Sequence, residues 1–331
     1  MLLKVFRGTT PRVIVLIILI LGALWIRAFF DPQLTGKAVY ETSPMPLYMI
    51  LKFLLGVHPL PGVIFSFLVL SLMLFLLINF NTTVFFINER TFFPAVIYLL
   101  FNALFPENQV LNPVLPASLF LMLALIRIMD AYRKPGIAYN FFDAAIMISI
   151  GSLFYANLLW FGLLVIIGIS LLRTGSIKEI AISVLGLATP YIIAVGLFYV
   201  LGMDPAKFFA DIKFNLFGET TGFTFGRLTI IVLIYSTLML LISLGFLMMQ
   251  LSSKKIKSRK TFYLLLWAIV ISVALYFALP SVSVEMIWIT AIPASYFLVH
   301  YFVFARKKIF PEIGFTGFLL LVVLIQVFSF F

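Results

Sequence analysis

Long apolar segments recur along the whole chain and constrain its fold more than any other feature. One of them, Phe141–Leu172, contains a single charged residue, Asp143. A membrane-spanning helix needs about 20 apolar residues, so this segment is too long for one span and just long enough for two. We predict a break near Tyr155, Ala156 and Asn157. The segments are apolar on every side, which excludes the alternating strands of a membrane β-barrel.

The composition excludes a water-soluble protein. Residues of the set AVILMFWYC make up 63% of the 331 residues and charged residues 11%, against about 45–50% and 25% in soluble proteins. So few charges cannot cover a surface that faces water. We therefore predict an all-α, polytopic transmembrane bundle of about eleven spans, forming a single integral membrane domain over residues 1–331.

The basic residues predict how the chain is oriented. Short cytoplasmic loops of membrane proteins are enriched in Lys and Arg. Lys4, Arg7 and Arg12 precede the first span, Val13–Phe30, so the N-terminus is predicted to be cytoplasmic and the C-terminus external. Splitting Phe141–Leu172 into two spans keeps the basic block Lys254–Lys260 cytoplasmic as well. The net charge of +11 then follows from topology, and no nucleic-acid partner is predicted.

One predicted span is short. Thr91–Phe105 contains few residues for a full crossing, so it is either a span or a tilted or re-entrant segment. The chain has no Cys, which excludes disulfides, thiolate metal sites and cysteine nucleophiles.

Two long external loops, residues 31–60 and 202–226, carry most of the external polar residues. In the first, Pro46–Val57 is apolar apart from Lys52 and is predicted to be a short interfacial helix. In the second, Asp204 and Pro205 are typical of a helix start. The residues after them predict a polar face (Lys207, Asp211 and Asn215, with an ion pair between the first two), an apolar face (Phe208, Phe209, Ile212 and Leu216) and an end at Gly218.

The cationic residues near the external side suggest phosphate binding. Arg27 lies about one turn before the external end of the first span, where it either binds a phosphate or extends to the headgroups. Lys52, Lys207 and Arg227 are external cations that either bind the phosphate of a lipid-linked molecule or contact ordinary headgroups. The predicted cytoplasmic loops lack phosphate-binding, metalloprotease and serine-hydrolase motifs. Any chemistry is therefore expected on the external side of the membrane or inside the bundle.

Two resemblances extend this interpretation. The stretch from Asn88-Glu89-Arg90 through Phe105-Pro106-Glu107 and Asn112-Pro113 to Arg173 resembles an uncharacterised family of multi-spanning inner-membrane proteins of Gram-negative bacteria. The layout of residues 1–201, a first span, an external loop with interfacial helices and then short spans, resembles the C-type glycosyltransferases. Residues 202–331 would add an interfacial helix and four further spans.

The second resemblance implies an activity. C-type glycosyltransferases take a sugar from a polyprenyl-phosphate carrier and use an external carboxylate as base. By this resemblance Asp31, directly after the first span, is the general base and Glu41 a second acid. The alternative is that Asp31 caps a helix or pairs with Arg27. Pro32 stands where that superfamily has a second acid. No metal site and no cofactor are predicted, and a divalent cation belongs only to the transferase alternative.

Three functions remain open. The first is a glycosyltransferase-like protein that acts on a lipid-linked substrate at the external leaflet of the bacterial inner membrane. The second is a non-catalytic subunit of a secretion or envelope-biogenesis complex, with other membrane proteins as partners. The third, a transporter, is less favoured, because the centres of the spans contain almost no ionisable residues. Membrane lipids are partners in all three.

Overall fold

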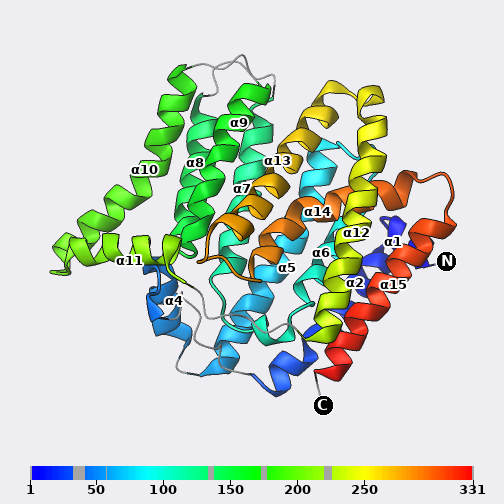
Figure 1. Cartoon of the computed structure of the whole chain (residues 1–331), viewed down its shortest axis with the longest axis horizontal. Helices are drawn as coiled ribbons and strands as arrows, with labels where there is room; N and C mark the ends of the chain where they lie inside the picture. The colour runs from blue at the N-terminus through cyan, green and yellow to red at the C-terminus, as the bar shows by residue number, and fades with distance from the viewer. Residues whose placement is uncertain are drawn as a thin grey trace.

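The protein is an all-helical bundle. The computed structural model describes residues 2–32, 42–56, 58–132, 138–172, 177–219 and 226–329. Within those ranges the regular structure is entirely helical, with fourteen α-helices and three short 3-10 helices (Figure 1). The all-α class predicted from the apolar segments is therefore confirmed.

Seven of the described helices are long and apolar enough to cross a membrane. They are α2 (Pro11–Phe30), α5 (Pro59–Val84), α10 (Ile177–Val200), α12 (Arg227–Gln250, extended to Ser253 by a 3-10 turn), α13 (Ile256–Ala278), α14 (Met286–Phe304) and α15 (Ile309–Phe328). A helix of about 20 apolar residues matches the thickness of the hydrocarbon core. The chain is a multi-pass membrane protein.

The four other predicted spans are shorter helices. They are α6 (Phe93–Asn102), α7 (Val114–Asp130), α8 (Ala138–Ser152), and the 3-10 helix η2 (Ala156–Phe161) continued by α9 (Gly162–Leu172). With ten residues, α6 is roughly 15 Å long, half of the hydrocarbon thickness. All its residues are buried, so protein rather than lipid surrounds it. The total of eleven crossings stays a prediction.

The predicted break in Phe141–Leu172 is confirmed. α8 ends at Ser152, the backbone is extended at Tyr155, and η2 begins at Ala156. The chain reverses closely at this point. Gly151 and Leu158 lie so near each other that a Cβ on Gly151 would overlap the Leu158 side chain. The two halves of the apolar stretch therefore run side by side as separate helices.

Aromatic side chains fill the centre of the bundle around α14. The hydroxyl of Tyr296 donates a hydrogen bond of 2.8 Å to the carbonyl oxygen of Leu77 in α5. Its ring lies 5.7 Å from that of Phe80 and 5.1 Å from that of Phe86. By contrast, α10 and α12 expose most of their apolar side chains, as helices on the lipid-facing periphery of a bundle do.

Both segments predicted to be interfacial helices are helical, as α4 (Pro46–Leu55) and α11 (Pro205–Phe217), and their place at the interface stays a prediction. The Asp204 carboxylate accepts a hydrogen bond of 2.9 Å from the backbone N–H of Ala206, and Gly218 follows the last turn. This side-chain cap satisfies a backbone donor that the first turn would leave unpaired. The predicted bounds of α11 are confirmed.

The predicted apolar face of α11 is present in part, since Phe208 and Leu216 are buried, but two other residues do not fit the predicted division. Asn215 is buried, at 5% exposure, whereas Phe209 is 57% exposed. The predicted ion pair is also not formed, because Asp211 accepts a hydrogen bond from Ser43 instead of meeting Lys207. Helical periodicity alone does not show that the segment before α4 supplies polar partners to α11.

The two ends of the bundle differ in their contents. α4 and the C-terminal end of α15 lie in the lower half of Figure 1, α11 lies above α4 at the left, and the turn from α12 to α13 lies at the upper end. That upper turn carries the basic block Lys254–Lys260. The short helix α1 (Leu2–Arg7) packs against α15 at the right of the view. Which end faces the cytoplasm stays a prediction.

Candidate functional site

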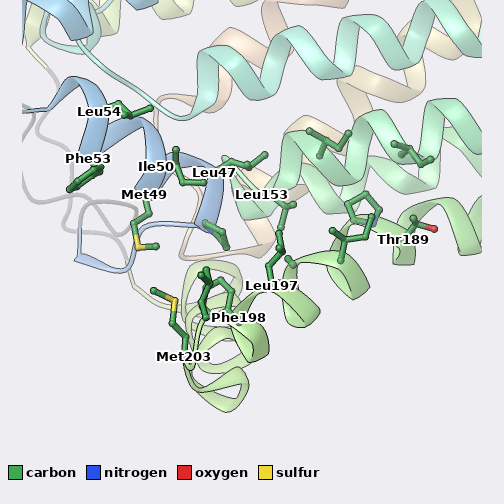
Figure 2. Close-up of a pocket in the computed structure, with 17 residues that line it drawn as sticks. Leu47, Met49, Ile50, Phe53, Leu54, Leu153, Thr189, Leu197, Phe198 and Met203 are labelled. Carbon is green, nitrogen blue, oxygen red and sulfur yellow. The ribbon is translucent and has the colours of Figure 1, made fainter.

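A cavity of about 800 Å³ lies between α4, α8 and α10. Figure 2 shows side chains of α4 facing those of α10 and Met203 across it. The lining consists of apolar residues and one threonine: Pro46, Leu47, Met49, Ile50, Phe53, Leu54, Ile146, Ile150, Leu153, Thr189, Pro190, Ile193, Ala194, Leu197, Phe198, Leu201 and Met203. The Thr189 hydroxyl donates to the Leu185 carbonyl oxygen of its own helix at 2.7 Å. The cavity therefore offers hydrocarbon contact almost exclusively.

The sequence of α10 explains why the cavity opens where it does. At Gly186, α10 lies so close to α8 that a Cβ would come within 2.7 Å of the Phe142 carbonyl oxygen. One turn later Pro190 lacks a backbone donor and interrupts the helical hydrogen-bond ladder. Beyond this proline α10 diverges from α8 (Figure 1), and the cavity occupies the region after the proline.

α4 closes the opposite side of the cavity and is held by two contacts. The Leu47 N–H donates to the Leu153 carbonyl oxygen at 3.1 Å, which joins the start of α4 to the end of α8. The Tyr48 hydroxyl is within 3.3 Å of the Leu111 carbonyl oxygen. These contacts turn Met49 and Phe53 toward the cavity, while Lys52 in the last turn is exposed.

α11 borders the cavity next to the end of α10. The ring of Phe208 lies 5.0 Å from that of Phe198, a lining residue, and 6.2 Å from that of Tyr191. The Tyr191 hydroxyl is hydrogen-bonded to Ser152 at 2.7 Å, which ties α10 to α8. Phe208 also belongs to a small apolar cluster with Met45 and Leu153. The cavity is therefore flanked by a well-packed helix that lies across its end.

A buried polar network stands behind α11. The Asn215 amide donates to the Ser43 carbonyl oxygen at 2.6 Å, and the Ser43 hydroxyl donates to the Asp211 carboxylate at 2.7 Å. The Asn157 amide donates to Ser281 at 3.2 Å, and the Ser281 hydroxyl donates to the Leu216 carbonyl oxygen at 2.6 Å. Buried polar groups that satisfy one another in this way fix a single arrangement. The network joins α4, α11, η2 and the turn before α14.

One buried acid lies in that turn. Glu285 is 5% exposed and directly precedes α14. Burial raises the pKa of its carboxyl to about 7, although hydrogen bonds from Ser283 and from the Tyr155 hydroxyl oppose the shift. A carboxyl that titrates near neutral pH can act as a proton donor or acceptor, and perturbed groups of this kind mark candidate functional positions.

The residues predicted to form the site lie in different parts of the structure. Asp31 is exposed at the end of α2, where its N–H donates to the Arg27 carbonyl oxygen at 2.8 Å. Arg27 is half-buried one turn earlier. Lys52 is on α4 and Lys207 on α11, the two helices that border the cavity. None of these four side chains lines the cavity itself.

The predicted set has two further members, Arg227 and Glu41. Arg227 is the exposed first residue of α12. Glu41 lies outside the described residues, so its predicted role as a second acid stays a prediction. In the described ranges, no three His, Cys, Asp or Glu side chains gather closely enough to hold a metal ion.

Four residues of this region were not predicted to belong to a site: Asn157, Asn215, Ser281 and Glu285. Asn157 had one recognisable signal, because it is a polar residue at a predicted break in an apolar stretch. The others have partners that are distant in the chain: Asn215 is 172 positions from Ser43, and Ser281 is 65 positions from Leu216. No pattern of local spacing identifies such partners.

Comparison with known proteins places the chain in a family. A family described as of unknown function (DUF6427) matches residues 37–331. The chain belongs to that family. The matched region includes α4, α8, α10 and α11, and begins after Arg27 and Asp31. No curated protein and no solved structure matches the chain.

Proposed function

We propose that this family member binds the hydrocarbon chain of a membrane lipid in the cavity between α4, α8 and α10. The observation that carries the proposal is the lining, which is apolar except for one internally bonded threonine. The volume of about 800 Å³ lies in the range of roughly 300–1,000 Å³ typical of small-molecule sites. A polar ligand would lose its hydration here without gaining hydrogen bonds.

The surroundings of the cavity support a membrane lipid as the source of the bound hydrocarbon chain. Three of the lining residues, Phe53 and Leu54 of α4 and Ile193 of α10, are themselves exposed, and so is Ile192 next to the cavity. Apolar side chains exposed on the outside of a membrane bundle contact acyl chains. An acyl chain that moves from the bilayer into the cavity would therefore pass from one hydrocarbon environment to another.

The ends of α4 and α11 supply charge for a headgroup. Lys52 and Lys207 are exposed on the two helices that flank the cavity. A lysine ammonium near a headgroup attracts phosphate. We propose that these two residues contact the phosphate of the bound lipid, which would suit either an ordinary phospholipid or a polyprenyl-phosphate carrier. Arg27 and Arg227 lie on other helices and are kept as separate predictions of phosphate contact.

Narrower roles remain predictions from the sequence. Sugar transfer with Asp31 as base, membership of a secretion or envelope complex, and location in the bacterial inner membrane each need their own test. An Asp31→Asn variant with normal protein level and full activity in cells would exclude catalysis by Asp31. A protein that always elutes alone from mild detergent would count against a stable complex.

Photo-crosslinking tests the lipid proposal directly. A phospholipid with a diazirine in its acyl chain is incorporated with the full chain into nanodiscs, and labelled peptides are mapped by mass spectrometry. We expect labelling to concentrate on residues 47–54 and 193–203. Labelling spread evenly over all exposed apolar helices would contradict the proposal.

Two substitutions on α10 make the test specific. Leu197→Trp places a large side chain in the cavity, whereas Ile192→Trp adds the same side chain to the outer surface of the helix. Both positions are exposed in the described structure, at 56% and 67%. We expect Leu197→Trp to reduce cavity labelling several-fold and Ile192→Trp to leave it unchanged. Equal effects of the two variants would reject a specific cavity site.

A further inference from the structure

A second cavity, of about 250 Å³, lies where α1 meets α6, α14 and α15. It is on the opposite side of the bundle from α4 and α10 (Figure 1) and shares no residue with the first cavity. Its lining combines three cations and one acid with apolar side chains: Leu3, Lys4, Arg7, Phe93, Phe302, Val303, Lys308 and Glu312. Phe93, Phe302 and Val303 are buried and form an apolar floor.

The cations around this cavity are held by contacts of their own. Arg7 makes a bidentate ion pair with Glu89, with its Nε and Nη2 at 2.6 and 2.8 Å from the carboxylate oxygens. The Lys308 ammonium donates to the Val303 carbonyl oxygen at 2.8 Å. Glu312 accepts from the backbone N–H of Leu3, at 3.3 and 3.4 Å. α1 is thus fixed over the cavity with Arg7 in a defined position.

Positive charge is in excess there. Lys4, Arg7 and Lys308 line the cavity with the Glu312 carboxylate, and Glu89 pairs with Arg7 from outside the lining, so three cations face two carboxylates. Burial lowers the pKa of Lys308, and the charge of Arg7 lowers it further, while Glu89 opposes the shift. Two neighbouring cations destabilise each other's charged form, and an anion bound between them would stabilise both.

We propose that this cavity binds a phosphate group, held by Lys4, Arg7 and Lys308. An anionic phospholipid fits the whole site best, because its glycerol and acyl carbons would rest on Phe93 and Phe302. Free inorganic phosphate offers the same charge without the apolar part. The site is independent of the lipid-chain cavity proposed above, so either proposal can fail without the other.

Native mass spectrometry of the full chain in mild detergent tests this proposal. Phosphatidylglycerol, phosphatidylcholine and inorganic phosphate are titrated separately, and bound copies are counted. We expect phosphatidylglycerol to bind at least about tenfold more tightly than phosphatidylcholine, because both carry the phosphate but the choline cation of phosphatidylcholine is repelled by Lys4, Arg7 and Lys308. Binding of inorganic phosphate without a preference between the lipids would identify free phosphate as the ligand.

Variants assign the binding to this cavity. Lys4→Gln combined with Lys308→Gln removes two lining cations, and the matched control Arg306→Gln removes an exposed cation of the same turn that does not line the cavity. We expect the double variant to lose the preference for phosphatidylglycerol and the control to keep it. An equal loss in both would indicate general attraction to a basic surface and overturn the proposal.

The wild-type protein alone also provides a decisive result. If it shows neither a preference for phosphatidylglycerol nor binding of phosphate, the proposal is wrong whether or not the variants fold. Thermal unfolding of the double variant separates loss of a ligand from loss of structure. A Lys308→Arg variant keeps the charge and is expected to retain binding.

Discussion

The side-chain amide of Asn215 donates a hydrogen bond of 2.6 Å to the backbone carbonyl oxygen of Ser43. This contact joins α11 to the segment that leads into α4, although the two residues are 172 positions apart in the chain. Because α4 forms one wall of the apolar cavity and α11 borders its end, the pair fixes the geometry of the proposed lipid site.

Replacing Asn215 by alanine is expected to destabilise that arrangement. The change removes the hydrogen bond to the part-buried Ser43 carbonyl oxygen, which costs about 1 kcal/mol. Thermal unfolding in detergent should show a lower midpoint, and lipid labelling of α4 should fall. Lys213→Ala, at an exposed position on the same helix, serves as the control. Equal midpoints for the two variants would show that the hydrogen bond does not hold α11.

Glu285 predicts a specific pH dependence of stability. Its carboxyl has a pKa of about 7 in the folded protein, against an ordinary value of 4.5. The folded state therefore binds the proton more tightly, so stability is highest below about pH 4.5 and falls as the pH rises to about 7. At about 1.4 kcal/mol per pKa unit, this group's contribution falls by about 3–4 kcal/mol across that pH range.

Glu285→Gln tests this dependence, because glutamine resembles the protonated acid in shape. Unfolding midpoints measured between pH 5 and pH 8 should decrease for the wild-type protein and change much less for the variant. If both proteins show the same slope, other groups control the pH dependence and Glu285 is not protonated in the fold.

His300 is expected to tolerate replacement by phenylalanine. Its side chain is fully buried in α14, and neither ring nitrogen has a hydrogen-bond partner within the described structure. Its ring lies 5.0 Å from that of Phe304 and 5.4 Å from that of Phe262. A buried polar group without a partner costs about 1–3 kcal/mol, so His300→Phe should leave the unfolding midpoint unchanged or raise it. A lower midpoint would contradict this expectation.

Asp31 is expected to be dispensable for binding of the lipid chain. It ends α2, which packs against α5 and α6, whereas the cavity is formed by α4, α8 and α10. Asp31→Asn should therefore leave the crosslinking pattern of the cavity unchanged, even if it abolishes a reaction in cells. Reduced labelling of α4 in this variant would contradict this expectation and show that Asp31 contributes to the lipid site.

The elements that local sequence determines were predictable. Asp204 and Pro205 specify the start of α11, and the polar break around Asn157 divides the long apolar stretch, because both signals act within a few residues. The cavity was not predictable, because it results from the packing of α4 against α10 from distant parts of the chain. The burial of Asn215 was not predicted for the same reason, because helical periodicity within α11 gives no information about Ser43, which is 172 positions away.

The central claim is that the cavity between α4, α8 and α10 contains a lipid chain. An experimental density map of the full chain in a lipid nanodisc tests it most directly. We predict elongated density between Met49 and Phe53 of α4 and Leu197 of α10. A map in which this space is closed by the protein's own side chains, or contains no elongated density, would contradict the account.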